Sequence, residues 1–129
     1  MTKQVVSDWF GKLPVAERSL PLLLLDGIVY TPQAAYDEVM RDSPVGQKLQ
    51  QLIESGRFGT TTEDEQSIAK TRLEQIYSAR PPDAPYVATL SGKTFTASQM
   101  IDELQSDSAI SHQWVNNEIQ HMNALVRIR

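Results

Sequence analysis

A weak internal repeat constrains the fold of this chain more than any other feature of its sequence. When the chain is shifted by 65 residues, segment 25–43 aligns with segment 90–108 without a gap. Seven of the 19 aligned pairs are identical, whereas random residues of ordinary composition match at roughly one position in 15. Such a period indicates that one supersecondary unit is used twice. The identical pairs are Leu25/Leu90, Gly27/Gly92, Thr31/Thr96, Asp37/Asp102, Glu38/Glu103, Asp42/Asp107 and Ser43/Ser108.

Each copy is predicted to contain a hairpin followed by two helices. Asp26-Gly27 is a favoured two-residue hairpin turn, and Ser91-Gly92 occupies the same place in the second copy. Thr31-Pro32 and Ser43-Pro44 each join a helix N-cap to a proline at the first helical position. Segment 96–99 (Thr-Ala-Ser-Gln) is a capping box at the equivalent helix start of the second copy. The identities therefore fall mainly on turns and caps, which specify the scaffold.

The remaining segments are predicted to be helical, apart from a loop over 57–61 and a stiff extended connector over 80–85. Thr62 and Glu65 have the spacing of a capping box and predict the start of a bridging helix. The similarity ends near Ser108, because the apolar stripe of the last helix is out of phase with its counterpart. We therefore expect one helix-rich α+β domain with short antiparallel strands, whose two hairpins either share one sheet or lie separately on helices. Its expected parts are an N-terminal helix (1–19), repeat 1 (20–56), a bridging helix (62–79) and repeat 2 (86–129) with a long C-terminal helix.

Composition excludes several classes of function. The chain has 129 residues, no cysteine and a net charge of −4. The absence of cysteine rules out disulfides and thiolate metal sites and fits a cytoplasmic location. A mild acidic excess gives no general attraction to nucleic acid or to anionic membranes. No nucleophile elbow or glycine-rich phosphate loop is present. We therefore expect a protein without enzymatic activity or cofactor, and without membrane attachment.

Aromatic and apolar residues outside the repeat are the strongest functional candidates. Trp9 and Phe10 lie near the amino terminus, and Trp114 adjoins the out-of-phase stripe of the last helix. Tryptophan and methionine are enriched where proteins meet, although the same side chains also fill protein cores. Our first hypothesis is a protein-interaction or assembly protein that forms a homodimer or larger assembly through this helix. The stripe consists of Val115, Ile119, Met122 and Val126.

The alternative function is DNA binding by a helix-turn-helix. Segment 43–56 has the apolar spacing of a recognition helix, and the preceding segment 31–40 would be the first helix. The outward face is nearly uncharged, however, and phosphate binding requires basic side chains. The residues available to contact DNA are Gln47, Lys48, Gln51 and Arg57.

Two weaker patterns involve carboxylates. Glu118 and His121 have the i, i+3 spacing that di-iron proteins use on one helix face, but the chain holds one such motif, so a second could come only from a dimer partner. The repeated pairs Asp37-Glu38 and Asp102-Glu103 would serve acid–base chemistry only if both reached one cleft. A solvated helix face is the simpler interpretation of both patterns.

Overall fold

The amino-terminal segment forms two helical elements. The computed structural model describes residues 3–88 and 92–129. Helix α1 spans Lys3–Lys12, and the short 3-10 helix η1 spans Val15–Ser19. Pro14 between them has an extended backbone (φ −55°, ψ 140°), and a proline cannot continue the hydrogen bonding of a helix. The expected N-terminal helical segment 1–19 thus consists of two helical pieces, divided at Pro14.

The first hairpin has the predicted turn. Strand β1 (Leu23–Leu25) pairs antiparallel with β2 (Ile28–Tyr30), and Leu25 faces Ile28 across the turn. Asp26 and Gly27 both take positive φ, at 51° and 78°, as a type I′ turn requires. All three residues of β1 are buried, whereas β2 lies mostly exposed. The hairpin therefore packs on the core through β1 and presents β2 to the outside.

Helices α2 (Pro32–Met40) and α3 (Pro44–Glu54) are joined by a tight Schellman turn. Asp42 takes the left-handed conformation (φ 59°), and the Ser43 N–H donates to the Glu38 carbonyl at 3.4 Å. Ser43 also caps α3 by accepting from the Gly46 N–H at 2.9 Å. Asp107 (φ 56°) and the residues around it make the same turn later in the chain. The aspartate before each cap thus provides the left-handed residue that ends the preceding helix.

The bridging helix α4 spans Thr62–Ser78, against the predicted 62–79, and its N-cap lies one residue earlier than predicted. Its N-cap is Thr61, whose hydroxyl accepts from the Asp64 N–H at 3.1 Å. The predicted capping box of Thr62 and Glu65 is therefore wrong. The Glu65 carboxylate instead pairs with Arg57 at 3.2 Å.

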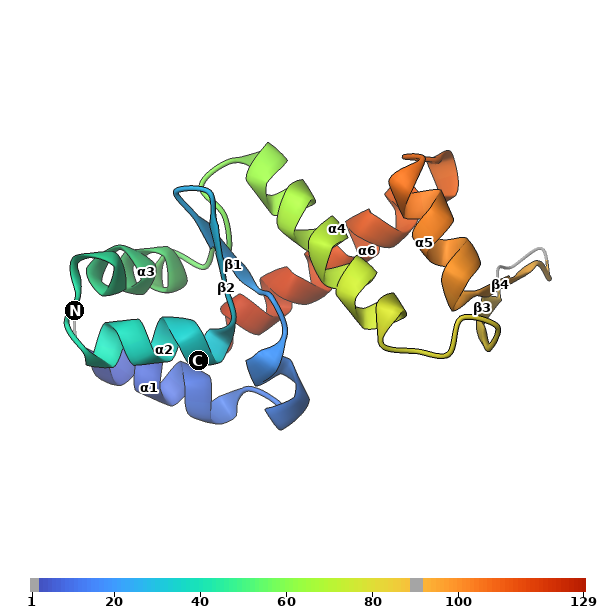
Figure 1. The fold of residues 1–129 in the computed structure, drawn as a ribbon. Helices are drawn as coiled ribbons and strands as arrows, with labels where there is room; N and C mark the ends of the chain where they lie inside the picture. Colours follow the sequence, from blue (N-terminus) through green and yellow to red (C-terminus); the bar gives the residue numbers. More distant parts are fainter. Residues whose placement is uncertain (1–2, 89–91) are drawn as a thin grey trace.

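The second hairpin forms a sheet of its own. Strand β3 (Pro85–Ala88) pairs antiparallel with β4 (Thr94–Thr96), and the two hairpins do not share a sheet. Figure 1 shows β3 and β4 at one end of the molecule and β1 and β2 nearer its middle, beside α3. The predicted turn at Ser91 and the matched Leu90 lie outside the described residues. Helices α5 (Ala97–Gln105) and α6 (Ala109–Val126) follow, and both hydrogen bonds of the predicted Thr96–Gln99 capping box are present.

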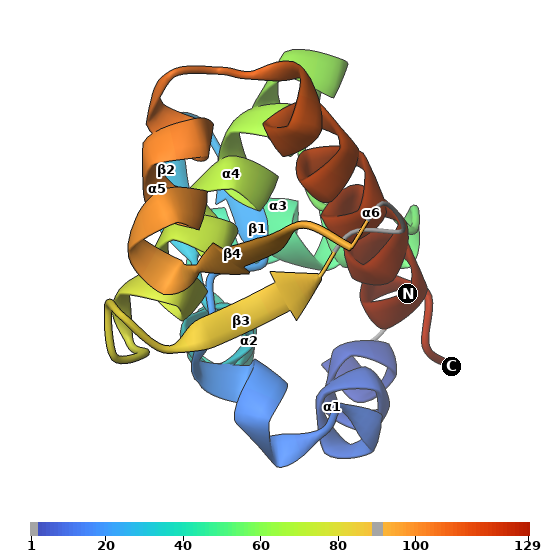
Figure 2. The ribbon, with the colours of Figure 1, turned by 90° about the vertical axis from the view of Figure 1, so that its right-hand side faces the viewer.

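Helices α4 and α6 cross near the middle of the molecule and connect two apolar clusters (Figure 1). Figure 2 shows α4 lying between α5 and α6, and α4 packs against both.

The last helix of each hairpin-helix-helix segment has different neighbours, because α3 packs mainly on α2 and α1, whereas α6 packs mainly on α4. The larger cluster is built from α1, the first hairpin, α2, α3 and the adjoining ends of α4 and α6; the smaller comprises Leu73, Tyr77, Phe95, Met100 and Leu104, with partly buried neighbours.

The observed fold is helix-rich α+β, as expected from the sequence. The succession of hairpin and two helices occurs twice, but whether one stretch is a copy of the other stays a prediction. Within the described residues, none of the helices combines the length and apolar character that a membrane span requires.

Candidate protein-binding cleft

Three of the seven predicted interface residues fill the core of the chain itself. Trp9, Met122 and Val126 are each 0% exposed. The Trp9 indole Nε1 donates to the Leu125 carbonyl at 2.9 Å, which satisfies its polar atom inside the core. These side chains offer no surface to a partner, because all three are buried in the larger apolar cluster.

The other four predicted interface residues are partly buried. Phe10 stacks on Tyr36 with ring centroids 4.5 Å apart. Trp114 packs edge-to-face on Phe95, with centroids 5.2 Å apart. Val115 contacts both apolar clusters, and Ile119 packs against the larger one. The stripe of α6 is therefore open to solvent only in its first half.

A cleft of about 550 Å³ lies between α4 and this first half of α6. The α4 residues lie at positions i, i+3, i+4 and i+7, which is one face of a helix. Among the described lining residues Val115 is the one with an apolar side chain, and it adjoins charged and amide side chains of both helices. The lining residues are Glu63, Gln66, Ser67, Lys70, Asp107, His112, Val115 and Asn116.

The cleft carries charges of both signs, and its side chains are well exposed. His112 Nε2 lies 2.8 Å from an Asp107 carboxylate oxygen, and their side chains are 58% and 73% exposed. In the described part of the chain the Ser67 hydroxyl makes no hydrogen bond to His112, so the nucleophile–base contact of a catalytic triad is not formed. Small-molecule pockets, in contrast, are enclosed and bury 70–90% of their ligand. This open cleft with exposed charged side chains suits a polypeptide better.

The predicted metal pair belongs to a buried ion-pair network. Arg72, whose side chain is 1% exposed, donates through Nε to Glu118 Oε2 at 2.7 Å and through Nη1 to the Pro21 carbonyl at 3.0 Å. Its Nη2 pairs with Glu17, whose second oxygen lies 3.6 Å from His121 Nε2. Among the described residues, no cluster of three or more His, Asp or Glu side chains could hold a metal ion. The spacing of Glu118 and His121 thus reflects a contact with Arg72 and Glu17 that the sequence alone did not reveal.

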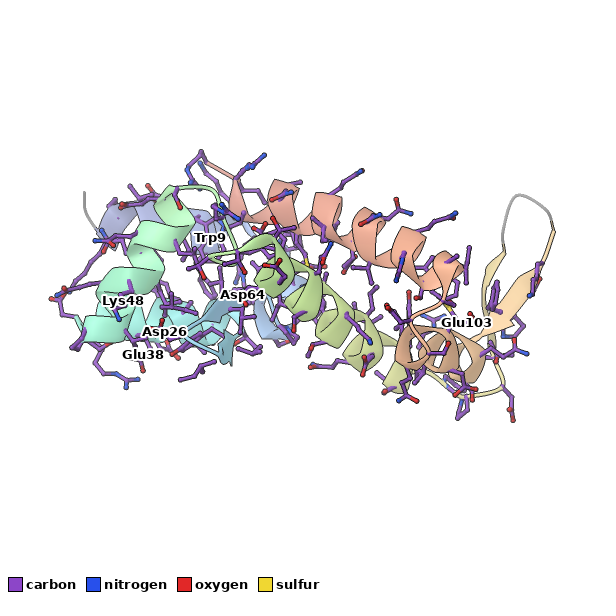
Figure 3. The ribbon with its side chains drawn as sticks, turned by 90° about the horizontal axis from the view of Figure 1, so that it is seen from above. Trp9, Asp26, Glu38, Lys48, Asp64 and Glu103 are labelled. Carbon is purple, nitrogen blue, oxygen red and sulfur yellow. The ribbon has the colours of Figure 1, made fainter. Side chains whose placement is uncertain are left out.

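The four candidate DNA contacts are all exposed, but both of the cations are paired with carboxylates. Lys48 lies 3.3 Å from Asp26 at the tip of the hairpin, and Figure 3 shows these two side chains near one another. Arg57 pairs with Glu65. The remaining exposed residues, Gln47 and Gln51, are uncharged. This surface therefore offers little positive charge to hold phosphates.

The repeated Asp-Glu pairs do not meet in one site. Glu38 and Glu103 lie at opposite ends of the molecule (Figure 3). Glu38 has a structural role, because its Oε2 accepts from the Ser43 hydroxyl at 2.6 Å and its other oxygen pairs with Arg41 at 3.0 Å.

Comparison of the chain with protein-family models, with curated proteins and with solved structures returns no match in any of the three. The function is therefore argued from the residues of the chain itself.

Proposed function

We propose that the chain acts by binding another polypeptide, and that the cleft between α4 and α6 is the surface it uses. The observation that carries this proposal is the position of Val115, an apolar side chain surrounded by polar and charged side chains of two helices. An apolar centre with a polar rim is the usual anatomy of a protein interface. The C-terminal helix would thus contribute through its first half.

The charges on the rim define the partner segment that fits. Lys70 can pair with a partner carboxylate, and Glu63 can pair with a partner lysine or arginine. Exposed pairs of this kind contribute little affinity but align the partner and set the association rate. A segment with one apolar anchor between residues of opposite charge is therefore the expected ligand, and it belongs either to another protein or to a second copy of the chain.

Two matched valine substitutions test this proposal. Val115→Asp places a carboxylate on the apolar centre of the cleft, whereas Val15→Asp makes the same change at a residue that is 76% exposed and does not line the cleft. Proteins co-purifying with the tagged chain from its source cells would be quantified for both variants. We expect at least one partner to be retained by Val15→Asp and lost with Val115→Asp. Equal recovery with both variants would contradict the assignment of the cleft.

Because Val115 also packs against both clusters, the result needs a control for folding. Lys70→Glu inverts a charge on the rim without removing apolar contacts. It should weaken the same partner while leaving the circular dichroism spectrum and the unfolding midpoint close to wild type. Loss of the partner only in variants that also unfold would sink the proposal.

A further inference from the structure

The outer edge of strand β2 carries backbone groups that have no partner in the described part of the chain. In an antiparallel pair closed by a two-residue turn, Leu25 and Ile28 form the hydrogen-bonded pair and Leu24 and Val29 the non-hydrogen-bonded pair. The N–H and C=O of Leu24 and Val29 therefore point away from the hairpin, on opposite sides. Leu24 finds its partner in the neighbouring loop, because its N–H donates to the Phe58 carbonyl at 2.8 Å. The backbone N–H and C=O of Val29 point to the open edge of the hairpin.

The side chains of this edge strand are unusually apolar for an exposed position. Ile28 is 55% exposed and Val29 is 43% exposed. Together with Val15 they are the large apolar side chains that the described residues leave exposed. Native proteins protect such edges with lysine, proline, a bulge or a covering element, because an open edge is a template for pairing with another chain. None of these devices lies within β2 itself.

The second hairpin shows the contrast within the same molecule. Its strand β3 begins at Pro85, and the register with β4 shifts between Pro85 and Val87. A proline and an irregular register both discourage edge pairing. The exposed residue Thr94 on β4 is polar. The first hairpin thus has an unprotected edge with apolar side chains. The second hairpin has a proline and an irregular register that discourage pairing at its own edge.

We propose that two copies of the chain associate through this edge, with β2 pairing antiparallel to β2 of the second copy. A two-fold axis beside Val29 would set its outward N–H and C=O against the same groups of the second copy, so that two reciprocal hydrogen bonds form. Ile28 of each copy then faces Tyr30 of the other. The product is a four-stranded antiparallel sheet built from two hairpins that are each marginal as isolated pairs.

A second copy fits this edge better than an unstructured peptide. Each copy brings a hairpin already ordered by its own turn and core, so pairing costs little conformational entropy. Strand β2 is only three residues long, so a peptide would gain few bonds for ordering its own backbone. The short strand also implies a small interface, and such interfaces give weak, transient complexes. This interface lies apart from the proposed cleft, so either proposal can fail without the other.

Sedimentation equilibrium of the full chain, from about 10 µM to about 1 mM, tests the pairing because weak dimers form in this range. We expect the average mass to rise with concentration toward that of a dimer. Val29→Lys, which adds the protective residue that native edges use, should weaken the association at least 10-fold. Val15→Lys, the matched change off the strand, should leave it unchanged. A monomeric wild type at the highest concentration would overturn the proposal, as would a dimer that Val29→Lys leaves intact.

Amide hydrogen exchange of the wild type provides a test that needs no variant. The Val29 N–H should exchange at least about 5-fold more slowly at high than at low concentration, because pairing removes it from water. The Ile28 N–H, already paired with Leu25, should change little and serves as the internal control. Protection of Val29 that appears only when a different protein is added would show a foreign strand on the edge and refute the second copy. Exchange at Val29 that does not depend on concentration would refute it as well.

Discussion

Removing the buried Arg72 guanidinium should be among the most damaging single changes in the chain. Arg72→Met keeps much of the side-chain volume but leaves Glu17 and Glu118, whose side chains are 17% and 14% exposed, without their cation. It also removes the hydrogen bond to the Pro21 carbonyl. Breaking a buried ion pair by deleting one partner costs about 3–5 kcal/mol. Because water still reaches both carboxylates, we expect a loss of about 3 kcal/mol, near the lower end.

Urea unfolding followed by circular dichroism measures this loss. With a slope of about 1.5 kcal/mol per molar urea, a loss of about 3 kcal/mol lowers the midpoint by about 2 M. Adding Glu17→Gln and Glu118→Gln to the variant should recover much of the stability, since no uncompensated charge then remains. Arg57→Met is the matched control, because it breaks the more exposed pair with Glu65 and should cost less than about 1 kcal/mol. Equal midpoints for Arg72→Met and Arg57→Met would refute the reasoning.

Three further substitutions have expected costs that the same unfolding measurement can check. Gly46→Ala would place a Cβ 2.2 Å from the Glu38 carbonyl oxygen, so separating α2 from α3 should cost about 2–3 kcal/mol; wild-type stability would contradict this close approach. Trp9→Phe should cost about 1–2 kcal/mol because it removes the 2.9 Å indole hydrogen bond to the Leu125 carbonyl, which then keeps only the longer bond from the Ile128 N–H at 3.4 Å. Thr96→Ala removes the N-cap of α5 and should cost about 1 kcal/mol, whereas no change would mean that the cap is replaced by water.

Much of the local structure could be predicted from the sequence, because turns and caps depend on neighbouring residues. The Asp26-Gly27 turn and the Thr31 and Ser43 caps are specified within four residues of chain. The N-cap of α4 is Thr61 and not the predicted Thr62, because Thr60, Thr61 and Thr62 are consecutive threonines and periodicity does not distinguish between them.

Tertiary contacts were harder to predict, because an amphipathic pattern shows that a face is buried but not what covers it. The α6 stripe predicts a surface for a partner, yet Met122 and Val126 pack into the larger apolar cluster of the same chain. Arg72 follows Ile68 by four residues and so lies on the buried face of α4, but its partners Glu17 and Glu118 are 55 and 46 residues away. A charged residue in an apolar stripe was the available signal.

The cleft itself had no distinctive sequence signal. Glu63, Gln66, Ser67 and Lys70 have the polar spacing of an ordinary solvated helix face. Only the packing of α4 against α6 turns that face into one wall of a cleft.

Site-specific photo-crosslinking in the source cells tests the central claim, that the chain binds a polypeptide in the cleft, most directly. A photoreactive side chain at Asn116, which lines the cleft, would be compared with one at Asn117, its exposed neighbour that does not. Successive helix positions point about 100° apart, so the two probes sample different surfaces of α6. We predict a discrete covalent complex with another polypeptide from position 116 and little or none from position 117. No complex from position 116, or equal complexes from both, would contradict the claim.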